Sequence, residues 1–97
     1  MINRLLLLIC FPAFSYATSF TDGSKDFGLS GGNDACWFDF NNDGWTDICV
    51  GGNVYRNVEG KKFEFITKTG PCVAADFDND GFLDLYSWRS RKFYRNI

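Results

Sequence analysis

Oxygen-bearing side chains recur at a fixed spacing in two short segments of the sequence. Counting from the first aspartate of each segment, they occupy positions 1, 3, 5 and 9. Oxygen ligands without nitrogen or sulfur select Ca²⁺ over transition metals. The spacing therefore predicts two Ca²⁺ sites. The first is formed by Asp39, Asn41, Asp43 and Asp47, and the second by Asp76, Asp78, Asp80 and Asp84.

The remaining positions of each loop fit the same interpretation. Position 6 is glycine in both, Gly44 and Gly81, and a chain that folds around an ion needs a sharp turn there. Position 7 would donate a backbone carbonyl, so its side chain is free to be Trp45 or Phe82. We therefore add these two carbonyls to the predicted ligands.

These loops differ from the EF-hand. An EF-hand loop ends in a bidentate glutamate at position 12, whereas that position here is Val50 or Ser87. The residues that follow are strand-like rather than helical. The alternative to metal sites is a pair of solvated acidic turns. The matched register of four oxygens and a glycine in both loops favours the metal.

The loops belong to a longer internal repeat. Asp39 to Ile48 recurs as Asp76 to Leu85, 37 residues later, and Tyr55-Arg56-Asn57 recurs as Tyr94-Arg95-Asn96, 39 residues later. A period near forty with four short strands is typical of propeller blades. The first period reads as strands Ala35–Phe38, Thr46–Val50, Asn53–Asn57 and Lys62–Thr67. We predict an all-β chain of about two four-stranded β-propeller-type blades, with repeat one at about 20–67 and repeat two at about 68–97.

The N-terminus has the layout of a secretory signal peptide. Arg4 precedes an apolar run from Leu5 to Phe14, and small residues stand at Ser15 and Ala17. The run is too short to span a bilayer, which takes roughly twenty residues. The alternative is a buried N-terminal strand or helix. We expect residues 1–17 to be removed, leaving a mature repeat region, 18–97, that is secreted to the cell envelope or beyond.

Composition narrows the functional classes. The 97 residues contain no histidine, which removes histidine-based acid–base catalysis and histidine-ligated zinc. The formal net charge of −2 argues against nucleic-acid binding. Four basic residues cluster near the C-terminus, and we interpret them as a charged edge strand rather than a polyanion site. They are Arg89, Arg91, Lys92 and Arg95.

Three cysteines remain in the mature region: Cys36, Cys49 and Cys72. Export would permit a disulfide, but an odd number leaves at least one thiol unpaired or paired with another chain. None of the three has a cysteine at its twin position in the other repeat. That favours small buried apolar residues over a disulfide framework.

The run from Asp76 to Tyr86, with Phe93 to Asn96 after it, resembles the FG-GAP/VCBS repeat family. It is similar to the variety found in cartilage-acidic-protein-like and UnbV-like secreted proteins. The resemblance implies β-propeller blades with a Ca²⁺ loop between adjacent strands, as in integrin head domains, and implies the ten ligand residues named above. Asn41 departs from the family by replacing an acid. Two repeats in place of about seven imply an incomplete propeller: a fragment of a larger β-propeller, a truncated reading frame, or a unit that completes itself by assembly. We expect the isolated chain to self-associate through its unpaired blade edges or to fold poorly.

These observations predict a secreted Ca²⁺-binding repeat module for binding or adhesion, without catalytic activity. Its ligand would be a protein or a glycan. The alternative is the repeat-bearing N-terminal piece of an exported carbohydrate-active enzyme.

Overall fold

The computed structural model describes residues 19–97, so the predicted signal peptide at 1–17 lies outside the described residues. Within them, one short helix precedes seven strands. The elements are α2 (Ser24–Phe27), β1 (Ala35–Phe38), β2 (Asp47–Val50), β3 (Asn53–Val58), β4 (Lys62–Lys68), β5 (Cys72–Ala75), β6 (Asp84–Ser87) and β7 (Lys92–Tyr94). No helix in this part of the chain is long and apolar enough to cross a membrane.

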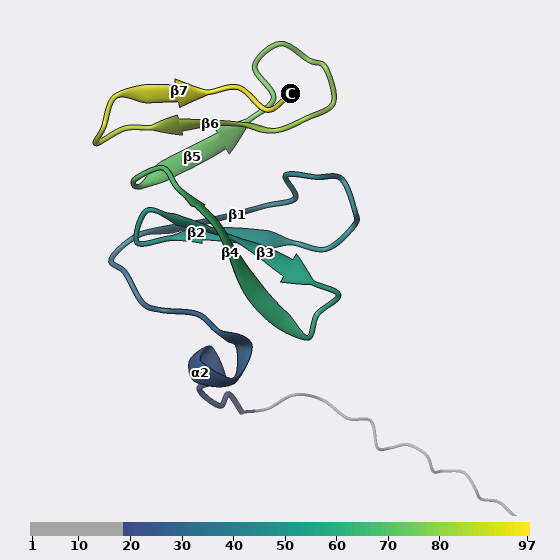
Figure 1. The fold of residues 1–97 in the computed structure, drawn as a ribbon, viewed down its shortest axis with the longest axis vertical. Helices are drawn as coiled ribbons and strands as arrows, with labels where there is room; N and C mark the ends of the chain where they lie inside the picture. Colours follow the sequence, from purple (N-terminus) through teal and green to yellow (C-terminus); the bar gives the residue numbers. More distant parts are fainter. Residues whose placement is uncertain (1–18) are drawn as a thin grey trace, which may run out of the picture.

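The strands form two antiparallel sheets in simple sequential order. The first sheet runs β1-β2-β3-β4 and the second runs β5-β6-β7 (Figure 1). This confirms the predicted all-β fold of about two propeller-type blades that form an incomplete propeller. The second sheet has three strands in the described residues where four were predicted. Predicted and observed limits of the first four strands agree within one residue at each end.

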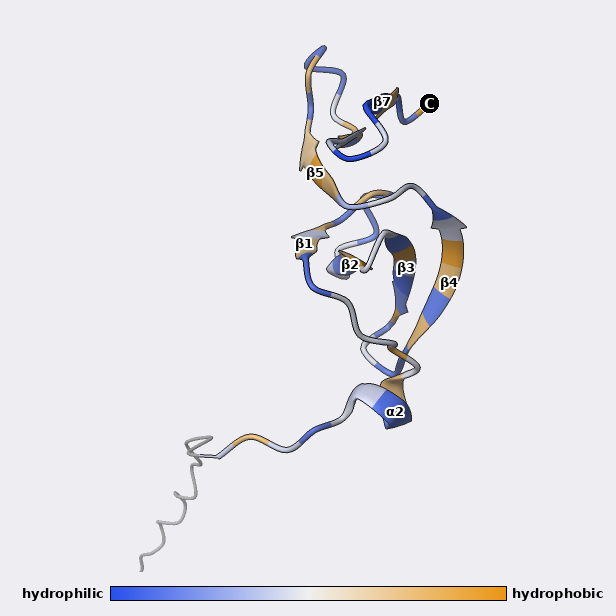
Figure 2. Cartoon of the chain, turned by 90° about the vertical axis from the view of Figure 1, so that its left-hand side faces the viewer, coloured by the Kyte–Doolittle hydropathy of each residue, from blue (hydrophilic) through white to orange (hydrophobic). Residues whose placement is uncertain are grey.

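The two sheets lie one above the other, with β5 next to β1 (Figures 1 and 2). Their shared core is small: Phe38, Cys49, Val54 and Cys72 are the buried members of one apolar cluster. A cleft of about 170 Å³ also opens between the sheets, lined by aromatic and aliphatic side chains of both. So small a core gives each hydrogen bond and close backbone contact between the sheets a large share of the stability.

Glycines let the chain pass from the first sheet to the second. Gly52, in the turn between β2 and β3, has a left-handed φ of 82°, and its carbonyl accepts the N–H groups of Thr69 and Gly70 at 2.9 and 3.0 Å. A Cβ atom on Gly52 would lie 2.8 Å from the Cα of Gly70. Gly52 must therefore stay free of a side chain for the linker to dock on the turn.

Replacing Gly52 with alanine should destabilise the fold more than an equivalent change in a roomy turn. Gly52→Ala adds a clash with Gly70 to the cost of a left-handed φ, so we expect a loss of about 3 kcal/mol. Gly44 is the matched control, because it has a φ of 87° but a Cβ added there would meet nothing within 4 Å. Gly44→Ala should cost only about 1 kcal/mol. Urea unfolding with a chelator present measures both, and equal losses would show that the Gly52–Gly70 contact does not matter.

Candidate metal centre

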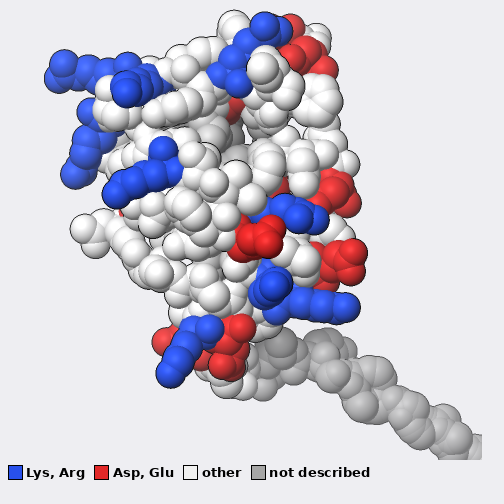
Figure 3. Space-filling model, viewed as in Figure 1, with Lys and Arg blue, Asp and Glu red and all other residues white. Residues whose placement is uncertain are grey.

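Both predicted loops connect the first and second strands of their sheets. The first loop joins β1 to β2, and the second joins β5 to β6, on the same side of the molecule (Figure 1). The Asn42 side-chain amide donates to the Gly81 carbonyl at 2.9 Å, so the two loops are in direct contact. On the face drawn in Figure 3, acidic side chains gather along this edge. The fold thus brings the two acidic segments together.

The position-1 aspartates hold the turns in shape. Asp39 accepts the N–H groups of Asp43 at 3.3 Å and Gly44 at 2.9 Å. Asp76 accepts the corresponding groups of Asp80 and Gly81 at 3.1 and 2.8 Å. The Gly81 N–H is the main reason that the pKa of Asp76 lies below its usual range. Asp76 is therefore ionised at neutral pH and carries the charge that a cation requires.

Further hydrogen bonds follow the same pattern in both loops. The position-5 carboxylates of Asp43 and Asp80 accept the N–H groups of Trp45 and Phe82 at 2.9 and 3.0 Å. Trp45 and Phe82 themselves are each 42% exposed, as expected of residues whose side chains are not ligands. The fourth position is asparagine in both loops, with a left-handed φ of 58° or 60°. Asparagine tolerates that conformation better than most residues, which explains its repetition.

The position-9 aspartates are buried and bind backbone groups on two sides. Asp47 is fully buried and accepts the Phe40 N–H at 3.0 Å and the Asn57 N–H at 2.7 Å. Asp84 is 1% exposed and accepts the Phe77 and Asn96 N–H groups at 3.3 and 2.8 Å. Burial raises the pKa of Asp47, and the hydrogen bonds from Asn57 and Phe40 oppose that shift. Each of these carboxylates therefore has a structural role in addition to any role as a ligand.

The sequence interpretation did not find the asparagines that complete this arrangement. The Asn57 amide donates to the Thr46 carbonyl at 2.9 Å, and the Asn96 amide donates to the Leu83 carbonyl at 3.1 Å. Asn96 also reaches the first repeat, where it donates to the Phe40 carbonyl at 2.6 Å. The recurring Tyr-Arg-Asn triplet was the available signal. The asparagine stands 10 residues after the buried aspartate in the first repeat and 12 after it in the second, and it makes the same contact with the loop in both.

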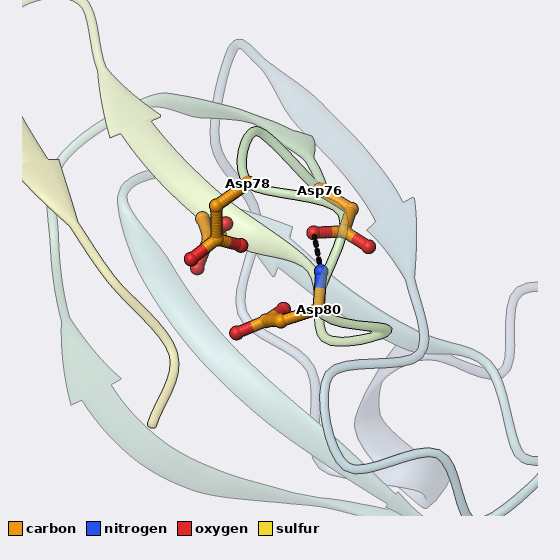
Figure 4. Close-up of side chains that lie close together, drawn as sticks. Asp76, Asp78 and Asp80 are labelled. Atoms are coloured by element: carbon orange, nitrogen blue, oxygen red, sulfur yellow. Dashed lines mark hydrogen bonds between the residues drawn. The ribbon is translucent and has the colours of Figure 1, made fainter.

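The second loop gathers all four of its predicted side-chain ligands. One carboxylate oxygen from each residue lies within 4.8 Å of the others, which is close enough for one ion to contact them all. The residues are Asp76, Asp78, Asp80 and Asp84. Figure 4 shows the first three pointing toward one another, with the Asp80 N–H bound to Asp76.

The first loop is less convergent. Among residues 19–97, its carboxylates do not form a second group of three within the same distance. The Asn41 amide oxygen accepts the Asp43 N–H at 3.3 Å, which keeps it turned toward the backbone of its own loop. The four predicted ligands of the first loop therefore lie in one loop, but their oxygens converge less closely than those of the second loop.

An arginine lies against the carboxylates of the second loop, whereas its counterpart in the first repeat pairs with a residue outside the loop. Arg95 contacts the Asp78 carboxylate through Nε at 3.1 Å and Nη2 at 2.8 Å, and Nη2 lies 3.9 Å from Asp80. Its positive charge offsets the repulsion between the gathered carboxylates. The corresponding residue of the first repeat, Arg56, instead pairs with Glu64 at 3.5 Å. Arg95 is therefore a counter-ion to the acidic loop as well as a member of the basic C-terminal cluster.

Comparison with known protein families agrees with this geometry. Residues 39–87 match the FG-GAP-like repeat. The chain belongs to the FG-GAP-like repeat family. The matched segment begins at the first aspartate of the first loop and includes both acidic loops of the FG-GAP repeat region. No curated protein and no solved structure matches the chain.

The two buried aspartates should be needed for folding even without metal. Asp47→Asn and Asp84→Asn each place an amide donor against a backbone N–H, so we expect each to lower the free energy of unfolding by about 1–3 kcal/mol. Asp43→Asn removes the same charge from an exposed carboxylate and should change the free energy of unfolding by less than about 0.5 kcal/mol. Urea unfolding in the presence of a chelator makes the comparison. Equal effects of all three variants would refute the structural role of the buried pair.

Proposed function

We propose that this chain is an exported, Ca²⁺-binding FG-GAP repeat module that serves in binding or adhesion and carries no chemistry of its own. The observation that carries the Ca²⁺ assignment is the convergence of four carboxylates, from Asp76, Asp78, Asp80 and Asp84, within 4.8 Å. All the side-chain donors are oxygens, as Ca²⁺ prefers. A bound cation would supply positive charge and hold the loop, a structural rather than a catalytic contribution.

The charges around the second loop support the proposal. Four carboxylates repel one another at this separation, and Arg95 provides one positive charge against them. A divalent ion would offset more of that repulsion than a single guanidinium. The unfolded chain has no preformed site, so binding should stabilise the folded state. The first loop offers one carboxylate fewer, and its affinity should be lower because affinity rises with ligand charge.

Calorimetric titration of the full chain with Ca²⁺ tests the assignment. We expect binding with a Kd on the order of 10⁻⁴ M, as in extracellular modules, and a rise in melting temperature. Asp80→Asn should remove the tighter event and Asp43→Asn the weaker one. Asp26→Asn is the matched control, because it removes one exposed carboxylate of α2, outside both loops. The assignment would be refuted if adding Ca²⁺ produced neither heat nor a shift in melting temperature. It would also be refuted if all three variants lost binding equally.

Arg95 should compete with the ion. Its contacts with Asp78 and Asp80 must loosen before a cation binds the same oxygens, so Arg95→Gln should tighten Ca²⁺ binding by about two- to five-fold. Arg56→Gln removes the same charge from the residue paired with Glu64 and controls for net charge. Calorimetry on both variants measures the difference. Weaker binding in Arg95→Gln would show that Arg95 supports the site instead.

The binding or adhesive part of the proposal is supported by the free edges of the sheets. β4 forms the outer edge of the first sheet, where Phe65 and Ile66 are 56% and 43% exposed. An exposed edge strand with apolar side chains is a template for pairing with another chain. We propose a protein or glycan ligand, together with self-association through these edges. Export is proposed from the signal-peptide pattern of residues 1–17.

A further inference from the structure

The three cysteines of residues 19–97 meet where the two sheets touch. Cys36 lies on β1, Cys49 on β2 and Cys72 on β5, and all three are free thiols. Cys36 stands directly opposite Cys49 in the β1–β2 pairing. The Sγ atoms of Cys36 and Cys72 are 3.9 Å apart, although 36 residues separate them along the chain. Figures 1 and 2 both show their strands, β1 and β5, side by side.

We propose that Cys36 and Cys72 form a disulfide that joins the two blades, while Cys49 remains a thiol beside it. The Cys36 and Cys72 sulfurs are already in contact across the sheet boundary. The Cys49 sulfur has further partners, since it also lies 3.9 Å from both the Thr69 hydroxyl and the Gly70 carbonyl. Cys49 is also the most buried of the three, at 2% exposure, whereas Cys36 is only partly buried. An incoming reagent therefore reaches Cys36 first.

The bond would form by thiol–disulfide exchange with a low-molecular-weight or protein disulfide of the exported environment. The Cys36 thiolate attacks one sulfur of that disulfide, which forms a mixed disulfide and releases one thiolate. The Cys72 thiolate then attacks the Cys36 sulfur, which forms the Cys36–Cys72 bond and releases the second thiolate. The two cysteine protons end on the two released thiols. The two cysteines are oxidised and the external disulfide is reduced by the same two electrons.

This bond has a physical benefit in so small a fold. It would close a loop that contains the first acidic loop and most of the first sheet, and long closed loops restrict the unfolded chain most. Small exported domains with modest cores commonly rely on such covalent links. Hydrogen bonding to Cys49 and Cys72, with burial, raises the pKa of the Cys36 thiol, so exchange should be slow at neutral pH.

Peptide mapping of the oxidised full chain can identify the bond. The folded chain is equilibrated with oxidised glutathione at mildly alkaline pH, and remaining thiols are alkylated. Trypsin cleaves after Lys25 and after Lys68, so Cys10 and Cys72 each leave the peptide that carries Cys36 and Cys49. A protease that cleaves before aspartate, at Asp39 and Asp47, then separates Cys36 from Cys49. We expect a Cys36–Cys72 cystine peptide as the main product, with Cys49 alkylated.

Variants and a melting measurement provide the controls. Cys49→Ser should still form the link, and oxidation should raise its melting temperature by about 5–10 °C. Cys72→Ser should show no such rise. The chain oxidised in urea serves as the reference, because it shows which cysteines pair when the chain is unfolded. The proposal would be overturned by a main product that joins Cys49 to either partner, or by a lasting glutathione adduct on Cys36. It would also be overturned if all cysteines were alkylated, or if the folded chain gave the same pairing pattern as the chain in urea.

Discussion

One buried carboxylate in each repeat organises the structure around it. Asp47 and Asp84 each accept a backbone N–H from the start of their own loop and another from the residue that follows the Tyr-Arg pair. A buried carboxylate is tolerated only when its oxygens are satisfied in this way. Each of these residues therefore links its loop, the strand that begins there and the end of the third strand segment. The turn geometry and the grouping of acids in the second loop both follow from this constraint.

The repeats share this framework but differ in how they manage charge. Asn41 removes one negative charge from the first loop, while Arg56 turns away from it toward Glu64. The second loop keeps four carboxylates and places Arg95 against two of them. The same backbone thus supports two different electrostatic environments. Side chains at two equivalent positions, one in the loop and one the arginine of the Tyr-Arg-Asn triplet, determine which environment forms.

Contacts between the repeats turn two small sheets into one unit. Asn42 and Asn96 each donate a hydrogen bond to a carbonyl of the other repeat, the Gly52 turn receives the linker to β5, and Cys36 meets Cys72 beside the shared core. Most of these contacts use short polar or small side chains, because the apolar core is too small to orient the sheets by itself. The acidic loops lie side by side because these contacts fix the angle between the sheets.

The local structure could be predicted from the sequence. Turn residues and the period of about forty predicted all four strands of the first sheet, and the repeated aspartate spacing predicted the residues that converge in the second loop. Such features depend on dihedral preferences and hydrogen bonds between residues close in the chain, which a sequence records directly. The signal-peptide and Ca²⁺ interpretations also come from the sequence and stay predictions.

The contacts between residues far apart in the chain became visible in the folded structure and could not be predicted beforehand. The fold placed Arg95 on Asp78, brought Asn96 to Phe40, and gathered Cys36, Cys49 and Cys72, which the sequence suggested were separate apolar residues. Within residues 19–97 none of these contacts has a twin in the other repeat, so comparison of the repeats could not reveal them. They depend on how one sheet stacks on the other, and that stacking results from the summed packing of both sheets rather than from any local pattern.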